Sequence, residues 1–257
     1  NKDGFLDFGV PYCDIIEELE KNNVIHIKKF IPNKDLANEL NWLCQEDIWH
    51  ALNKDYSNDR IWHELEKEEL RNKTLENIEP NQSANHKFSY IHFDFIDQEK
   101  RIDNDVFRVM PSFLSPIYKK MIDFHCFLTG YEKDPLEYRK QLVSYTEGCF
   151  FGLHQHDYEP QKYGFITLLT KRGRDYSEGG TRFYYKDKVL DTGEIEDIGD
   201  MFIFKYDLIH EVTKISFEDC KGYSYRDKGE MLQVKLGRKT ALIPWIEKFS
   251  KVAIDVD

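Results

Sequence analysis

Three side chains that commonly bind metal ions stand close together in the segment FGLHQHDYEP, at His154, His156 and Asp157. A further histidine, His210, follows 56 residues after His154, in the segment GDMFIFKYDLIHEV. Two imidazoles and a third donor on adjoining strands, with coordination positions left open, suit a divalent transition metal such as iron. The residue types and their spacing therefore predict a metal site.

The third donor is open between two neighbours. Successive side chains of a strand point to opposite faces, so His154 and His156 share one face, while Asp157 points to the other. A bulge or a turn that starts at position 156 brings Asp157 round instead. We favour His154 and His210 as ligands, with a slight preference for Asp157 because a carboxylate matches Fe(II) chemistry, although alternation favours His156. A third possibility also stays open, in which His156 and Asp157 belong to the metal-binding motif and His154 lies outside it.

The elements that must position these residues are short β segments. From residue 138 onward, turn signals recur about every 8–12 residues, which is typical of a sandwich or jelly roll. The expected strands are KQLVSYTEG, CFFGLHQH, YGFITLLTK, GGTRFYYKD, KVLDTG, GDMFIFKY, HEVTKISF, MLQVKLG and KTALIPWI. Both histidine segments stand at strand ends in this pattern.

Helices gather in the first half of the chain. We expect helices at 33–43, capped by Asn33, and at 111–130, closed by Gly130, with helical character through the 60s and strands at 22–32 and 86–97. The predicted fold is α+β in one domain, 1–257. It divides into a mainly helical part with one or two strands (1–137), a jelly-roll core (138–246) and a tail (247–257).

Charge and composition exclude several partners. Acidic residues outnumber basic ones by 47 to 36, and no basic cluster stands apart, so neither nucleic acid nor an anionic membrane surface is expected as a partner. No stretch approaches the roughly 20 apolar residues of a membrane span. The five cysteines form no CxxC pair, which favours free thiols and a cytoplasmic location. Nothing in the sequence indicates an oligomeric state.

Further motifs follow the histidines in a fixed order. They are a strand with Gly179-Gly180, a turn with Gly199-Asp200, the distal His210, and then Arg238-x-Thr240. Over roughly residues 138–246 this order resembles the 2-oxoglutarate/Fe(II)-dependent dioxygenase superfamily. The resemblance implies a double-stranded β-helix, that is, a jelly-roll barrel with the N-terminal helices packed against it. It also implies Fe(II) and 2-oxoglutarate as cofactors.

The resemblance also implies roles for individual residues. His154 would be the first iron ligand and His210 the distal one. Arg238 and Thr240, two apart on one strand face, would bind the distal carboxylate of 2-oxoglutarate, since a guanidinium holds a carboxylate bidentately. Tyr145, on the strand before the metal motif, is a weaker addition to the cosubstrate site. The implied reaction uses O2 to hydroxylate an unactivated C–H of a small molecule, such as an amino acid or a natural-product intermediate.

Two departures from the family pattern bear on these roles. Position 156 holds histidine where the family has a carboxylate, and neither His156 nor Asp157 leaves the gap that related halogenases use for halide, which disfavours halogenation. Arg238 lies 28 residues after His210, a long spacing that implies an inserted polar loop at 217–231. Lys221 and Arg226, inside that loop, are the alternative carboxylate anchors.

Two other functions stay open. One is a cupin-like metal dioxygenase that uses no 2-oxoglutarate, which a three-histidine site would fit. The other is a non-catalytic metal-binding barrel. The segment IHFDF contains a literal His92-x-Asp94, which we interpret as a decoy outside the barrel strands, facing solvent or a substrate channel.

Overall fold

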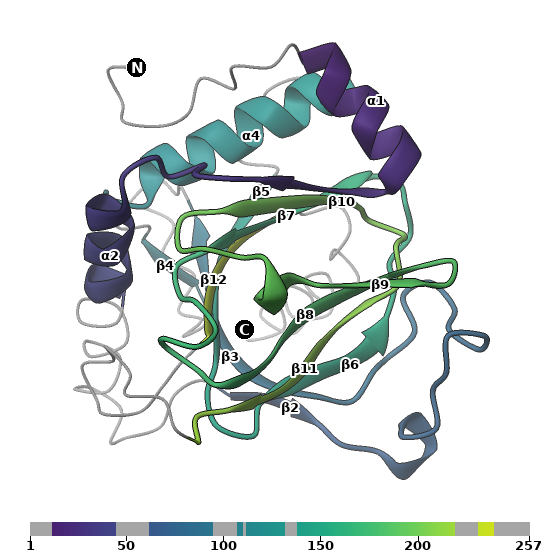
Figure 1. Ribbon diagram of the computed structural model, residues 1–257. Helices are drawn as coiled ribbons and strands as arrows, with labels where there is room; N and C mark the ends of the chain where they lie inside the picture. Colours follow the sequence, from purple (N-terminus) through teal and green to yellow (C-terminus); the bar gives the residue numbers. More distant parts are fainter. Residues whose placement is uncertain are drawn as a thin grey trace, which may run out of the picture.

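Within the described residues, a curled, mostly antiparallel sheet of 12 strands dominates the computed structural model (Figure 1). The structure describes residues 12–44, 62–94, 107–109, 112–131, 138–218 and 231–238. The strands follow one another in the order β1-β10-β7-β12-β5-β3-β6-β11-β8-β9, with β2 and β4 paired to β3. Neighbours far apart in sequence, such as β3 beside β6, show that the sheet wraps around on itself as a jelly roll does.

The strands are short, as the turn spacing predicts. Their bounds are β1 Val24–Ile27, β2 Trp62–Leu65, β3 His86–Asp94, β4 Phe107–Val109, β5 Tyr138–Tyr145, β6 Phe150–His154, β7 Tyr163–Leu168, β8 Glu178–Tyr185, β9 Lys188–Asp191, β10 Met201–Lys205, β11 His210–Ser216 and β12 Met231–Arg238. The strands from β5 to β12 confirm the predicted run of β segments. The ninth predicted segment, KTALIPWI at 239–246, lies outside the described residues.

The described helices are α1 (Tyr12–Asn22), α2 (Lys34–Leu43) and α4 (Ser115–Thr129). The predicted cap of α2 is confirmed, because the Asn33 side chain accepts a hydrogen bond from the Asp35 amide at 2.9 Å. Gly130 closes α4 in the left-handed conformation, with φ 70°. None of these helices combines the length and the apolar character that crossing a membrane requires.

The helices cover one face of the sheet and leave the other to line the barrel. In Figure 1, α1 and α4 lie along the strands β5, β7 and β10. Phe165 of β7 meets Phe124 of α4 edge-on at 6.2 Å between ring centroids, while its neighbour Ile166 belongs to a separate cluster with Phe183. Both faces of β7 are therefore buried, which explains why its burial does not alternate.

The barrel interior is aromatic. Two clusters of buried residues fill it: Phe88, Val143, Tyr145, Cys149, Tyr176, Val212, Ile215 and Met231 in the first, and Ile166, Leu168, Phe183, Phe202, Phe204 and Leu208 in the second. Burying such rings stabilises the fold by about 2–3 kcal/mol each. The same rings form an apolar lining around any polar group placed among them.

The backbone conformation and close contacts explain why glycine stands at Gly179 and at Gly199. Gly179 has φ +91°, a conformation that L side chains rarely adopt, and a Cβ there would lie 2.5 Å from the backbone oxygen of Lys214. Gly199 has φ +87°, and its Cβ would lie 2.8 Å from the oxygen of Ile31. These positions let β8 approach β11 and let the turn before β10 pass close to the β1–α2 connection.

The N-terminal half differs from expectation in three ways. The helix expected through the 60s is wrong: this segment forms β2 and a single 3-10 turn at Glu68–Leu70. The described residues before position 138 hold four strands, where one or two were expected. Strand β3, which carries His92 and Asp94, pairs with both β5 and β6, so residues 91–94 of the IHFDF segment belong to the barrel sheet.

Candidate metal centre

Three histidines meet where β6 and β11 lie side by side. The ligand atoms of His154, His156 and His210 all lie within 4.8 Å of one another. His154 ends β6 and pairs directly with His210, the first residue of β11. The ring centroids of these two histidines are 4.1 Å apart, and that of His156 lies 5.1 Å from His154. The predicted convergence of residues 56 positions apart is thus produced by strand pairing.

The two strand histidines present the same nitrogen to the cluster. Nδ1 of His154 lies 2.8 Å from the backbone oxygen of Gly152, and Nδ1 of His210 lies 2.7 Å from that of Leu208. Since a carbonyl only accepts, each Nδ1 carries the proton and each Nε2 keeps its lone pair. Such a bond on the far nitrogen sets the tautomer and ring orientation that a metal ligand needs.

Aromatic rings hold each imidazole in place. Phe151 stacks on His154 at 4.0 Å, and Tyr206 stacks on His156 at 4.2 Å. Phe204 lies 5.0 Å from the ring of His210. The backbone N–H of His156 also donates to the Tyr206 oxygen at 3.4 Å, which anchors the residue after β6 has ended. The cluster is therefore positioned before any ligand arrives.

The surroundings keep the imidazoles neutral. Burial, followed by the neighbouring His210 and His156, lowers the pKa of His154 well below its usual value. Burial and the charge of Lys235 lower the pKa of His156 to about 4. Burial, with His156 next, lowers the pKa of His210 to about 3. Neutral imidazoles are the form that binds metal ions, so the donor set fits a transition metal such as Fe(II).

Asp157 lies apart from the cluster. It is exposed, and its carboxylate accepts a hydrogen bond from the Asn81 side chain, while its backbone N–H donates to the same residue at 3.4 Å. The slight preference for Asp157 as third donor therefore does not match this geometry, which brings His156 into the group instead. β6 ends at His154, and the two hydrogen bonds with Asn81 hold Asp157 at the surface.

A partly buried cation lies near the histidines, and sequence reasoning missed it. The ammonium of Lys235, on β12, lies 5.7 Å from the ring centroid of Tyr145, which is fully buried. Burial lowers the pKa of Lys235 to about 8, and its charge lowers the pKa values of all three histidines. Among the described residues, no carboxylate forms an ion pair with this ammonium.

Two polar atoms beside Lys235 also lack hydrogen-bond partners within the described part of the chain. They are the Tyr145 hydroxyl and the Gln233 side-chain oxygen. The Gln233 amide donates to the Thr181 hydroxyl at 3.0 Å, so its side chain is fixed inside the barrel. Burial without a partner costs free energy unless a ligand supplies one. A cation and a free hydroxyl together suit a carboxylate ligand.

The other predicted anchors are placed less completely. Arg238 ends β12, opposite Tyr138 of β5. In the alternation along β12, the backbone position of residue 238 falls in the same set as Val234 and Leu236, which belong to the cluster under the helices. Lys235 falls in the other set, with Gln233. Thr240 lies outside the described residues, as do Lys221 and Arg226.

The pattern of β12 contains a weak signal for Lys235. In LQVKLGR, apolar residues alternate with Gln233 and Lys235. This pattern is typical of an ordinary strand whose polar face points to solvent. Only the curling of the sheet shows that the polar face points into the barrel.

Comparison with known proteins supports the fold. No protein-family model and no curated protein matches this sequence. A prolyl-4-hydroxylase from Pseudomonas putida is similar in structure, with a TM-score of 0.51 and 12% identity over 88% of this chain and 97% of that one. A 2OG-Fe(II) oxygenase family oxidoreductase from Burkholderia pseudomallei gives a TM-score of 0.46 and 12% identity, covering 90% and 92%. A carbocyclase, SnoK, from nogalamycin biosynthesis gives 0.48 and 6%, covering 89% and 83%.

The comparison with the Pseudomonas hydroxylase confirms the predicted fold. The chain shares the fold of that hydroxylase, a double-stranded β-helix with helices packed on its outer face. Fold alone does not set chemistry, which depends on the side chains within it.

Proposed function

We propose that this protein is an Fe(II)- and 2-oxoglutarate-dependent oxygenase. The observation that carries the proposal is the cluster of His154, His156 and His210, with fixed tautomers, inside a barrel of this fold. Fe(II) and 2-oxoglutarate, when bound, supply the means to activate O2 and to oxidise an unactivated C–H bond. The side chains described above hold and orient these groups.

The three imidazoles are the proposed metal ligands. His154 and His210 offer Nε2, because their Nδ1 protons are donated to backbone carbonyls. His156 takes the third position, held by its stacking on Tyr206. Three side chains leave coordination positions for a cosubstrate and O2. The aromatic rings around the histidines exclude water from these positions.

Lys235 is the proposed anchor for the distal carboxylate of 2-oxoglutarate. Its ammonium has already lost hydration in the free protein, as its lowered pKa indicates, so an anionic ligand gains most of the interaction. The Tyr145 hydroxyl, which has no hydrogen-bond partner among the described residues, is the proposed second donor. Arg238 and Thr240 remain the alternative anchors.

The proposed reaction is hydroxylation of a small molecule such as an amino acid or a natural-product intermediate. The aromatic barrel interior favours an apolar group at the site of oxidation. The similar structures include a prolyl hydroxylase, so a prolyl side chain is a reasonable first member of a substrate panel.

One observation favours a second function. Among the residues that the structure describes, the group of possible metal ligands contains three imidazoles and no carboxylate. This set also suits a cupin-like dioxygenase that binds its substrate without 2-oxoglutarate. In that case the Lys235 ammonium would receive a substrate carboxylate. A non-catalytic metal-binding barrel would show metal binding and no turnover.

Anaerobic titration separates these functions. Fe(II) is added to the apoprotein and then 2-oxoglutarate, while the visible charge-transfer band of the metal chelate is recorded. Wild-type protein should bind one Fe(II) and then develop the band. Iron binding without a band would remove 2-oxoglutarate from the account, and absence of iron binding would refute the metal centre itself. Consumption of 2-oxoglutarate in air then tests for catalysis.

A further inference from the structure

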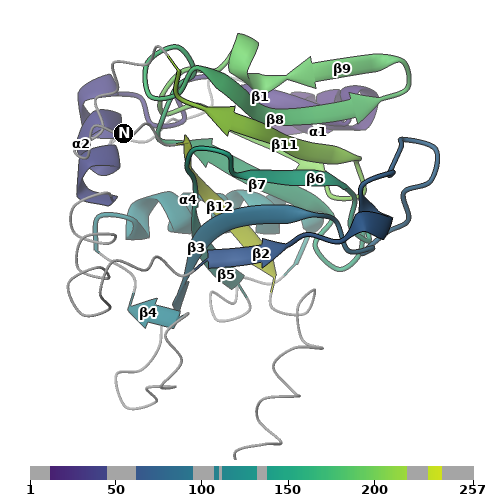
Figure 2. The same cartoon turned by 90° about the horizontal axis from the view of Figure 1, so that it is seen from below.

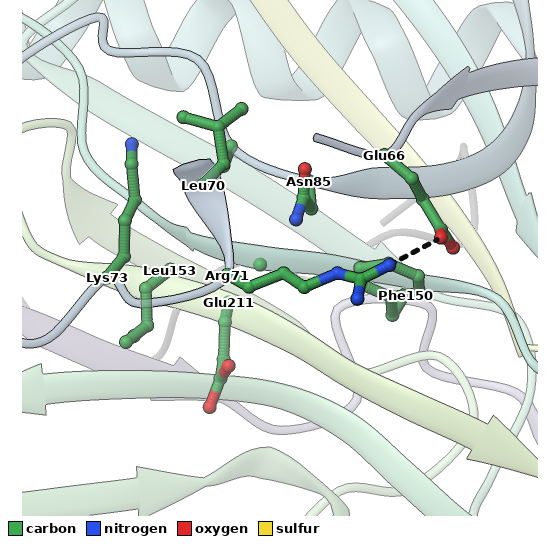
Figure 3. Close-up of a pocket in the computed structure, with 10 residues that line it drawn as sticks. Glu66, Leu70, Arg71, Lys73, Asn85, Phe150, Leu153 and Glu211 are labelled. Carbon is green, nitrogen blue, oxygen red and sulfur yellow. Dashed lines mark ion pairs between the residues drawn. The ribbon is translucent and has the colours of Figure 1, made fainter. Parts of the chain in front are cut away.

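A pocket lies on the outer face of the strands that carry the metal-site histidines. It has a volume of about 450 Å³ and is covered by the connection between β2 and β3. Figure 3 shows its side chains, and Figure 2 shows the β2–β3 connection passing the end of β6. A volume of this size holds a small molecule.

This pocket is separate from the metal centre. Leu153 and Glu211 line it, and each is the direct neighbour of a metal-site histidine, His154 or His210. On β11, adjacent residues point to opposite faces, so Glu211 points away from the face that carries His210. The register of β6 against β11 is irregular: Phe151 packs against the interior cluster, while Leu153 lines the pocket. The pocket and the histidines therefore lie on opposite sides of these two strands. A ligand in the pocket therefore does not contact the metal.

The lining combines an apolar floor with a weak ion pair. Phe150, Leu153 and Leu70 supply apolar surface. The Arg71 guanidinium reaches toward the Glu66 carboxylate (Figure 3), at 3.9 Å between Nη2 and Oε2, with side chains 63% and 48% exposed. An exposed pair of this length contributes about 0–1 kcal/mol. Both charged groups are therefore available to a ligand that offers them better partners.

The charges of the pocket are balanced. Glu66 and Glu211 are acidic, and Arg71 and Lys73 are basic. Glu211 already accepts a hydrogen bond from the Tyr184 hydroxyl, and the Lys73 ammonium donates to the Ser83 carbonyl at 2.5 Å. A simple anion would lie near two carboxylates, and a simple cation near two basic groups. A molecule that carries both a positive and a negative charge can place each one next to pocket residues of the opposite sign.

We propose that this pocket binds a free amino acid with an apolar side chain. The α-carboxylate pairs with Arg71, which can hold it bidentately. The α-ammonium pairs with Glu66, and the side chain lies on Phe150 and Leu153. The zwitterion replaces one long ion pair by two short ones. This site is independent of the function proposed for the metal centre.

Calorimetric titration of the full chain with three matched probes tests the proposal. L-phenylalanine carries both charges, L-phenylalaninamide lacks the carboxylate, and N-acetyl-L-phenylalanine lacks the ammonium. L-phenylalanine should bind at least about tenfold more tightly than either derivative, the equivalent of one charge-assisted contact. Arg71→Gln should remove the preference over the amide, and Glu66→Gln the preference over the acetylated probe.

A matched ion pair supplies the control. Lys87 and Glu64 form a pair of similar exposure on the neighbouring strands β3 and β2, at 3.3 Å, outside the pocket lining. Lys87→Gln should leave the binding of all three probes unchanged. Circular dichroism and thermal unfolding confirm that each variant is folded.

Several outcomes would overturn the proposal. They are no binding of L-phenylalanine at millimolar concentration, equal affinity for the three probes, or an unchanged preference in both pocket variants. Binding that survives Arg71→Gln but is lost in His154→Gln would place the amino acid at the metal centre instead. Because the titration uses metal-free protein, its result does not depend on whether the oxygenase proposal holds.

Discussion

Replacing Lys235 tests whether the barrel interior binds a dicarboxylate. Lys235→Met keeps an unbranched side chain of similar length and removes the charge. In the described structure the ammonium lies over the Tyr145 ring, without an ion-pairing carboxylate. We expect the variant to bind 2-oxoglutarate more weakly and to bind Fe(II) at least as well as wild type, because a positive charge near the metal has been removed.

The expected magnitude follows from the state of Lys235 in the free protein. Its pKa of about 8 shows that burial has already weakened its hydration. A carboxylate that binds it gains a charge-assisted hydrogen bond without that cost, worth about 1.5–3 kcal/mol. The dissociation constant of 2-oxoglutarate should therefore rise by about 10- to 150-fold.

The assay is the anaerobic titration of the Fe(II) protein with 2-oxoglutarate, followed by the charge-transfer band. Arg238→Met is the matched comparison, because its backbone position has the opposite parity on the same strand. We expect it to change the dissociation constant by less than about threefold. If Lys235→Met binds like wild type while Arg238→Met loses affinity, the anchor is Arg238 and the assignment of the interior cation is refuted.

Three other predictions concern the metal ligands, pH and backbone strain. His156→Gln should weaken Fe(II) binding by about 100-fold or more, whereas Asp157→Asn should change it by less than about threefold. Calorimetric titration of the two variants with Fe(II) decides between these neighbouring candidates. The reverse order of effects would restore Asp157 as the ligand. Affinity for 2-oxoglutarate should be constant below pH 8 and fall above it, because Lys235 loses its proton near its pKa of about 8; an equal fall in Lys235→Met would contradict this. Gly179→Ala should lower the free energy of unfolding by about 2 kcal/mol or more, and clearly more than Gly173→Ala. Both glycines have positive φ, but only at Gly179 would a Cβ meet a backbone atom. Equal losses of the two variants in denaturant unfolding would show that the structure relieves this contact.

Short sequence patterns predicted those helices, caps and strands whose structure depends on residues close by in the chain. The Asn33 cap, the left-handed Gly130 and the run of strands from β5 to β12 each follow from turn, cap and alternation rules. The segment of the 60s was assigned wrongly, because its charged and apolar residues have helical propensity, while pairing of β2 with β3 decides its structure. Strand pairing is a long-range interaction that local propensity does not contain.

The sequence by itself determined which residues could serve a metal site. Two histidines at strand ends, with glycine motifs between them, were enough to predict that His154 and His210 converge. Strand alternation also placed His156 beside His154, and the structure agrees with alternation where chemical preference pointed to Asp157.

Only the tertiary structure decided which polar residues face the interior. Lys235 and Gln233 look like the solvated face of a strand, since alternation distinguishes two faces but does not say which of them is buried. The curled sheet places one face of β12 under the helices and the other inside the barrel. Burial then gives the Lys235 ammonium its lowered pKa and its need for an anionic partner, because desolvation depends on every strand around it and not on its own sequence neighbours.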